Sequence, residues 1–227
     1  MGVTSKIADT LFPYIPKCAG CGVEKEAENG FCPSCREEMD KLRHGATSAM
    51  NLPAFSCYDY DGMAMRIVRG YKYSGKKYMH KLLAYEMAQG LKETGWKPGA
   101  VCHVPLHMRR TKERGFDQAE LLAREIAQIT GLPFAPAIRR VRYTKTQTKL
   151  SEAERRANMD GAFEGTMPVG GGVLLVDDVL TTGATAAECA KVLQQNGAAN
   201  VYIVTYARAV FGGRKRSWLR RILGRLV

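Results

Sequence analysis

The sequence predicts an α/β protein built on a parallel sheet and preceded by a small zinc-binding module. From Ala54 onward, short apolar runs alternate with stretches whose apolar residues recur every three or four positions, the pattern of strands alternating with helices. Before them lie two Cys-x-x-Cys pairs, a spacing typical of a metal site. With 227 residues, 45% hydrophobic and 25% charged, the chain has room for one domain and a small addition. This composition excludes a wholly disordered or fibrous protein.

Residues 1–50 are predicted to form the metal module and a linker. Cys18, Cys21, Cys32 and Cys35 offer four thiolates, which complete the tetrahedral coordination of Zn²⁺ and leave no position for water. The zinc is therefore expected to be structural and to supply most of the folding free energy of a segment with few large apolar side chains. Two disulfides are the alternative, and a cytoplasmic setting disfavours them. The stretch 44–53, which lacks a periodic pattern, is predicted to be the linker.

Four strands are expected in the body, residues 51–212. Residues 55–58 and 101–105 are short apolar runs, as strands are. Residues 172–176 are apolar after the first glycine and rich in β-branched side chains, as expected for a central parallel strand. Residues 200–206 return as the fourth strand. Strands separated by helices imply parallel βαβ connections, and such sheets bind ligands beyond the carboxyl ends of their strands.

Three helices are expected between these strands. Residues 76–93 and 115–130 each carry an apolar stripe at three- and four-residue spacing, which marks one buried helix face. Residues 183–196 form the third helix, which Gly197 ends because glycine readily adopts the left-handed conformation that follows a helix.

Positive charge is concentrated in two segments of the chain. Lys and Arg number 34 against 22 Asp and Glu, a net charge of +12. The stretches 139–150 and 214–225 are both rich in Lys and Arg and contain no acid, which indicates anionic partners. A solvated basic surface is the alternative. Residues 213–227 are predicted to form a basic amphipathic helix that docks on the body, binds a partner or nucleic acid, or lies on an anionic membrane surface.

The sequence is expected to belong to a cytoplasmic protein. No apolar run approaches the 18 residues of a membrane span, and residues 1–16 lack the long apolar core of a signal peptide. If the final helix binds lipid, the protein would be peripheral to the inner membrane.

The most specific pattern lies at the end of the strand expected over 172–176. Asp177 and Asp178 follow it, and small hydroxyl-bearing residues lead from them into a helix. Carboxylates can hydrogen-bond a vicinal diol, whereas hydroxyls and backbone N–H groups at a helix N-terminus bind phosphate. A carboxylate pair that only caps a helix is the alternative. The pattern predicts a ribose 5-phosphate site, with the diol on the two aspartates and the phosphate on Thr181, Thr182, Gly183, Ala184 and Thr185.

The run 173–185 resembles the signature of the type I phosphoribosyltransferases, which bind phosphoribosyl pyrophosphate (PRPP). Together with other motifs, it is similar to the ComF family of competence proteins over about residues 11–208. Asp117 departs from this pattern, since the family usually has Asn there. The further motifs are the two Cys-x-x-Cys pairs, Lys72-Tyr73-x-Gly75, Val104-Pro105-Leu106-His107-x-x-Arg110, Glu113-Arg114-Gly115-Phe116-Asp117-Gln118, Thr144-x-x-Gln147-x-x-Leu150 and Arg156-x-Asn158-x-x-Gly161-Ala162-Phe163.

The resemblance implies a type I phosphoribosyltransferase-like fold in which Asp177 and Asp178 are the catalytic pair and Mg²⁺ accompanies PRPP. Cations after the second strand are expected to face the pyrophosphate, and residues 139–158 to form a mobile hood over the ligand. Lys72 is either a ligand contact or a surface lysine, and His107 either functional or structural. The expected pyrophosphate-facing cations are Arg109, Arg110 and Arg114.

Two functions are open at this point. The resemblance implies an accessory factor that binds PRPP and handles single-stranded DNA in natural transformation, alongside other competence proteins. The alternative is an active phosphoribosyltransferase that transfers ribose 5-phosphate from PRPP to an acceptor. That reaction needs a neutralised leaving group and a held acceptor, and Thr181 stands where purine-salvage enzymes often carry an acid. The first function is therefore favoured.

Overall fold

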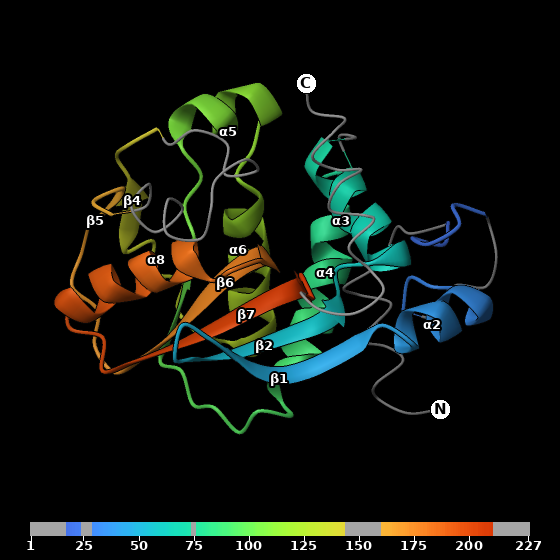
Figure 1. Cartoon of the computed structure of the whole chain (residues 1–227), viewed down its shortest axis with the longest axis horizontal. Coiled ribbons are helices and arrows are strands. Elements are labelled where there is room, and N and C mark those ends of the chain that lie inside the picture. The colour runs from blue at the N-terminus through green and yellow to red at the C-terminus, as the bar shows by residue number, and fades with distance from the viewer. Residues whose placement is uncertain (1–16, 24–28, 74–75, 144–159, 211–227) are drawn as a thin grey trace.

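The computed structural model describes residues 17–23, 29–73, 76–143 and 160–210. These residues form a five-stranded sheet between layers of helices, with a small two-stranded sheet at one end (Figure 1). The strands are β1 (Arg43–Ala49), β2 (Leu52–Asp59), β3 (Ala100–His103), β4 (Ile138–Arg140), β5 (Phe163–Gly165), β6 (Gly172–Leu180) and β7 (Asn200–Arg208). The helices are α2 (Pro33–Asp40), α3 (Gly62–Tyr73), α4 (Met79–Leu91), α5 (Met108–Arg114), α6 (Gln118–Thr130) and α8 (Ala184–Gln195).

The larger sheet confirms the predicted α/β class. Its strand order is β1-β2-β7-β6-β3. β2, β7, β6 and β3 run parallel, and β1 is an antiparallel strand at one edge. The parallel arrangement brings the carboxyl ends of β3 and β6 to the same edge of the sheet, where ligands bind in folds of this kind.

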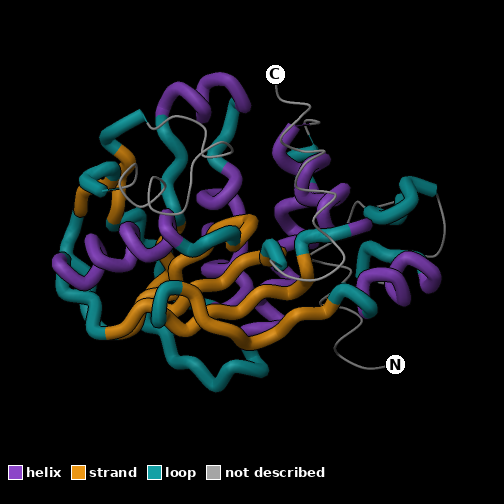
Figure 2. Tube along the Cα trace, viewed as in Figure 1, coloured by secondary structure: helices purple, strands orange, loops and turns teal. Residues whose placement is uncertain are grey.

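Helices cover both faces of the sheet, as Figure 2 shows. Helices α3, α4 and α6 pack against one face, and α8 packs against the other. Along β6, Leu174 and Val176 join the first core, whereas Val173 and Leu175 join the second. Side chains alternate between the faces of a strand, so Asp178 lies on the α3 face and Asp177 on the α8 face.

The predicted linker over 44–53 is wrong, because this segment forms β1, its turn and the start of β2. Most residues of β1 are exposed, and the segment therefore lacks an apolar alternation. Met50 and Asn51 have φ angles of 51° and 64°. Two successive residues with positive φ form the mirror-image turn that suits a tight hairpin.

Several further elements differ from the sequence prediction. Helices α3 and α5 and strands β4 and β5 have no counterpart among the predicted elements, although Met63, Ile67 and Tyr71 of α3 recur at helical spacing and are buried. Strand β6 continues to Leu180, four residues beyond its predicted end, because it stays paired with β7 through Arg208. The two aspartates therefore lie within the strand and not after it.

Some predictions fall outside the described part of the chain. The basic helix over 213–227 and residues 144–158 of the predicted hood lie there. Within the described ranges, none of the helices has the length and apolar character needed to cross a membrane.

Candidate functional site

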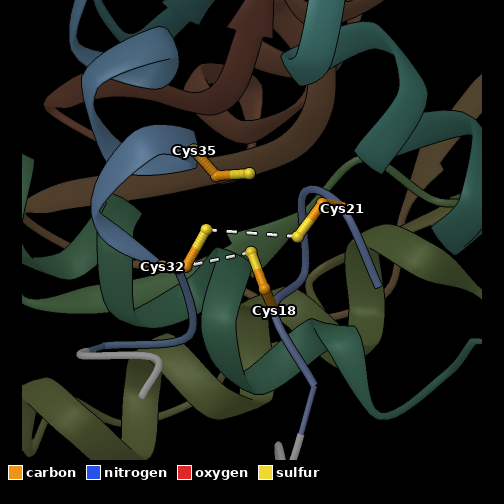
Figure 3. Close-up of side chains that lie close together, drawn as sticks. All are labelled: Cys18, Cys21, Cys32 and Cys35. Carbon is orange, nitrogen blue, oxygen red and sulfur yellow. Dashed lines mark hydrogen bonds between the residues drawn. The ribbon is translucent and has the colours of Figure 1, made fainter. Parts of the chain in front are cut away.

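The four predicted zinc ligands lie together in space (Figure 3). Their sulfur atoms all lie within 4.8 Å of one another, and the Sγ atoms of Cys21 and Cys32 are 4.0 Å apart. Tetrahedral zinc with Zn–S bonds of about 2.3 Å requires sulfurs about 3.8 Å apart, so the cluster fits one ion with small movements. Cys18, Cys32 and Cys35 are buried, which suits a structural site.

Local hydrogen bonds favour thiolates in part of this cluster. The hydroxyl of Ser34 and a backbone N–H lower the pKa of Cys32 to about 6. Burial opposes ionisation of Cys18, but several backbone N–H groups still lower its pKa. Burial raises the pKa of Cys35. Thiolates are the form that binds metal, and a divalent cation would draw the remaining protons off the cluster.

A cavity of about 310 Å³ opens at the carboxyl ends of β3 and β6. The last paired residue of β3 is His103, opposite Val176. Strand β6 runs past this point, and both aspartates line the cavity together with Val104, Pro105 and Leu106 from the loop after β3. Six residues that were predicted from the sequence to contact the ligand line this cavity, namely Asp177, Asp178, Arg110, Arg114, Thr181 and Thr185.

Four other described residues that the sequence assigned to the ligand do not line this cavity, namely Arg109, Thr182, Gly183 and Ala184. The guanidinium of Arg109 lies over the ring of Tyr143, 5.3 Å from its centre. The Thr182 hydroxyl accepts a hydrogen bond of 3.5 Å from the N–H of Ala184, the first residue of α8. Gly183 has a φ of 83°, and a Cβ there would lie 3.1 Å from that of Ala49. Glycine therefore lets the loop before α8 pack against the β1–β2 turn.

The cavity includes residues that the sequence did not assign to the ligand. The ammonium of Lys72 lies 2.9 Å from a carboxylate oxygen of Asp178, an ion pair between residues distant in sequence. Burial opposes the charge on Lys72, but the Asp178 carboxylate nevertheless raises its pKa. Burial and the neighbouring Asp178 carboxylate raise the pKa of Asp177 to about 8. Tyr60, Asp117 and Gln118 are the polar lining residues that the sequence did not assign, whereas the role of Lys72 was left open and Arg140 belongs to the predicted hood.

Known proteins give a second line of comparison. No protein-family model matches the chain. It is 31% identical over 216 residues to the DNA utilization protein YhgH of Salmonella typhimurium, and the match covers 92% of this chain and 91% of the relative. The competence protein F of Haemophilus influenzae is 28% identical over 209 residues, covering 87% and 86%. This chain belongs to the YhgH and ComF family.

The family assignment confirms the resemblance on which the sequence prediction relied. Competence protein ComFC of Bacillus subtilis is 26% identical over 196 residues, covering 85% of this chain and 78% of the relative. Among solved structures, an adenine phosphoribosyltransferase gives a TM-score of 0.40 at 15% identity, covering 82% of this chain and 93% of that one. The family rests on the sequence relatives alone.

Two ComF motifs meet beside the cavity. Arg114 donates from Nη1 to the side-chain oxygen of Gln118 at 2.7 Å and from Nη2 to the hydroxyl of Tyr73 at 3.1 Å. The hydroxyl of Tyr71 donates to the carbonyl of Gln118 at 2.8 Å. The Lys72-Tyr73 motif on α3 is thus joined to the Glu113–Gln118 motif between α5 and α6.

Asp117, where the ComF pattern usually has Asn, has a structural role. One carboxylate oxygen accepts the N–H of Glu120 at 3.1 Å and caps α6. The other accepts the N–H of Leu106 at 2.6 Å and holds the loop that follows β3. Burial raises the pKa of this carboxyl. Both oxygens are used by backbone donors, so the side chain ties the loop after β3 to the start of α6.

His107 and Arg140 differ in their relation to the cavity. The Nδ1 atom of His107 accepts the N–H of Arg109 at 3.2 Å, so this histidine caps α5, which favours its structural reading. Arg140 lines the cavity, and burial together with the charge of Arg110 lowers its pKa. An anion bound beside Arg140 would offset this loss by stabilising its charged guanidinium.

Proposed function

We propose that this ComF-family chain binds PRPP and serves as an accessory factor for single-stranded DNA in natural transformation. The observation that carries the proposal is one cavity in which Asp177 and Asp178 lie with Arg110, Arg114 and Arg140. Carboxylates accept hydrogen bonds from the ribose diol, and guanidinium groups neutralise pyrophosphate. The hydroxyls of Thr181 and Thr185 and the N-terminus of α8 would receive the 5-phosphate.

Magnesium is proposed to enter with PRPP. The bases that line the cavity outnumber the acids, with Lys72, Arg110, Arg114 and Arg140 against Asp117, Asp177 and Asp178, so the site suits an anion. When bound, Mg²⁺ would supply further neutralisation of the pyrophosphate charge.

Single-stranded DNA is proposed to bind along the rim of this cavity. Tyr73 and Tyr143 are 65% and 42% exposed. The guanidinium of Arg114 lies 4.9 Å from the centre of the Tyr73 ring, and Arg109 lies over Tyr143. Exposed aromatic rings beside cations are the features by which proteins bind single strands without sequence preference. The names of the relatives, DNA utilization protein and competence protein, agree with such a partner and with other competence proteins as neighbours.

Handling of incoming strands would place the protein in the cytoplasm. We propose that the basic segment 213–227, outside the described residues, holds it against the anionic surface of the inner membrane. Co-sedimentation with anionic vesicles tests this, and truncation after Gly213 is expected to release the protein. Equal sedimentation of both forms would exclude the membrane role.

Calorimetry with PRPP and Mg²⁺ tests the pocket. Replacement of both Asp177 and Asp178 by Ala is expected to abolish binding, because the diol loses its acceptors, while circular dichroism shows an intact fold. Asp160→Ala is the matched control, since Asp160 is exposed and lies outside the cavity lining. Unchanged affinity in the double variant would refute the ribose-phosphate site.

Pyrophosphate release from PRPP distinguishes the accessory factor from an active transferase. We expect no release above background with nucleobases, amines or single-stranded DNA as acceptors. DNA affinity is expected to fall steeply with salt, because phosphate contacts release counterions. Catalytic release with any acceptor would favour the transferase, and a salt-independent DNA affinity would refute electrostatic binding.

A further inference from the structure

The acid pair of the cavity, Asp177 and Asp178, has the ammonium group of Lys72 beside it. The ammonium of Lys72 lies 2.9 Å from an oxygen of Asp178, and the two side chains are 19% and 8% exposed. Lys72 lies in the last turn of α3, and Asp178 lies on the face of β6 that α3 covers. Burying a charge is costly unless it is paired, so this contact offsets the burial of both groups and holds the Asp178 side chain in place.

The contact leaves Asp178 able to bind a ligand. An ionised carboxylate has about four lone-pair sites on its two oxygens, and the Lys72 contact uses one oxygen. Both residues line the cavity, so a sugar hydroxyl can still approach the carboxylate. The neighbouring Asp177 is largely protonated at neutral pH, because burial and Asp178 raise its pKa to about 8. The negative charge of the pair is therefore close to that of one carboxylate.

A divalent cation at this pair would meet the ammonium of Lys72. The like charges would repel each other at short range in a partly buried site. Arg110, Arg114 and Arg140 line the same cavity, so its walls already carry the charges that a phosphate dianion needs. A metal is thus not required for charge balance unless the ligand also carries pyrophosphate.

We propose that Lys72 is the resident cation of the acid pair and that this cavity takes ribose 5-phosphates without a divalent metal. The inference rests on the proposed ribose-phosphate site and adds its metal requirement and a positioning residue. Lys72 acts through Asp178: it holds the carboxylate toward the diol and carries the opposing charge. Magnesium is then needed only for the pyrophosphate of PRPP.

Ribose 5-phosphate, which lacks pyrophosphate, is the probe that tests this. Calorimetry on the full chain compares buffer freed of Mg²⁺ by a chelating resin with the same buffer containing Mg²⁺, after elemental analysis has verified the metal of the cysteine cluster. The wild-type affinity is expected to differ by less than about threefold between the two. Lys72→Met is expected to bind at least about tenfold more weakly without Mg²⁺, and Mg²⁺ is expected to restore part of this loss. Lys76→Met is the matched control, since Lys76 is exposed.

Each result of these titrations either supports or overturns the inference. Wild-type binding that requires Mg²⁺ would overturn the inference and leave the ribose-phosphate site standing. No binding in either buffer would overturn both. Lys72→Met with wild-type affinity in the metal-free buffer would show that Lys72 does not hold the acid pair. If Lys72→Met fails to fold, the wild-type comparison with and without Mg²⁺ still tests the inference. Lys72→Arg, which keeps the charge, is then expected to bind ribose 5-phosphate without Mg²⁺.

Discussion

Arg36 and Glu86 form a two-pronged ion pair, with Nη2–Oε1 and Nη1–Oε2 distances of 2.9 and 3.2 Å. Arg36 follows Cys35 of the cysteine cluster in α2, and Glu86 lies on α4 in the body. The hydroxyl of Tyr58, on β2, donates to the same carboxylate. Because Glu86 is only 8% exposed, this contact joins the cysteine module to the body through a largely buried charge.

Arg36→Ala is expected to lower the free energy of unfolding by about 3 kcal/mol, because it leaves the Glu86 carboxylate buried without its cation. Urea denaturation measures the change. Arg66→Ala is the control, since Arg66 pairs with Glu38 across α2 and α3 while their side chains are 59% and 49% exposed, and it should cost less than about 1 kcal/mol. Equal losses in the two variants would contradict this reading.

Removal of the metal is expected to destabilise the whole described fold and not only the cysteine module. Cys18, Cys32 and Met39 belong to the same buried cluster as Leu82. We expect one equivalent of zinc per chain by elemental analysis and its loss in Cys35→Ser, with a lower melting temperature. Cys102→Ala, a buried thiol outside the cluster, should keep the zinc. A metal-free protein with an unchanged melting transition would refute the structural role.

The sequence predicts the central parallel strands well because they are buried on both faces and almost wholly apolar. β1 escapes prediction, since an exposed edge strand has no apolar period. The clustering of the four cysteines and the position of the two aspartates at a cavity are predictable because each comes from a short local sequence pattern. The Lys72–Asp178 and Arg36–Glu86 pairs are not, since only the packing of α3 against β6 and of α2 against α4 brings these charges together.

Asp117→Asn is expected to loosen the loop after β3, although it restores the residue usual in the family. Two backbone donors, from Leu106 and Glu120, use the two carboxylate oxygens, whereas an amide offers only one oxygen. The loss of one hydrogen bond costs about 1 kcal/mol, and Asp117→Ala, which loses both, should cost more. Denaturant melts are expected to rank stability in the order wild type, Asp117→Asn, Asp117→Ala, and PRPP titration is expected to rank affinity in the same order. A variant with Asn that is as stable as the wild type would show that one oxygen serves both donors.

Asp177→Asn is expected to stabilise the ligand-free protein, and more so as the pH rises. Burial and Asp178 raise the pKa of Asp177 from its ordinary 3.8 to about 8, so the folded protein holds this proton more tightly than the unfolded chain. The bound proton stabilises the folded protein fully below the pKa that Asp177 has in the unfolded chain. This stabilisation is lost as the pH rises toward the pKa of Asp177 in the folded protein. Asparagine is neutral throughout and avoids this loss.

Thermal melts from about pH 5.5 to about pH 9 measure this difference. The gain of Asp177→Asn over wild type should grow through this range and level off above pH 8, where a stabilisation of about 1 kcal/mol would raise the melting temperature by about 2–4 °C. Asp160→Asn, at an exposed carboxylate, should show no such trend. PRPP should reverse the order, because both oxygens of Asp177 can bond the diol, whereas the amide offers only one oxygen. Parallel pH profiles for the wild type and Asp177→Asn would mean that Asp177 is ionised in the empty pocket, and the acid pair would then carry two negative charges beside Lys72.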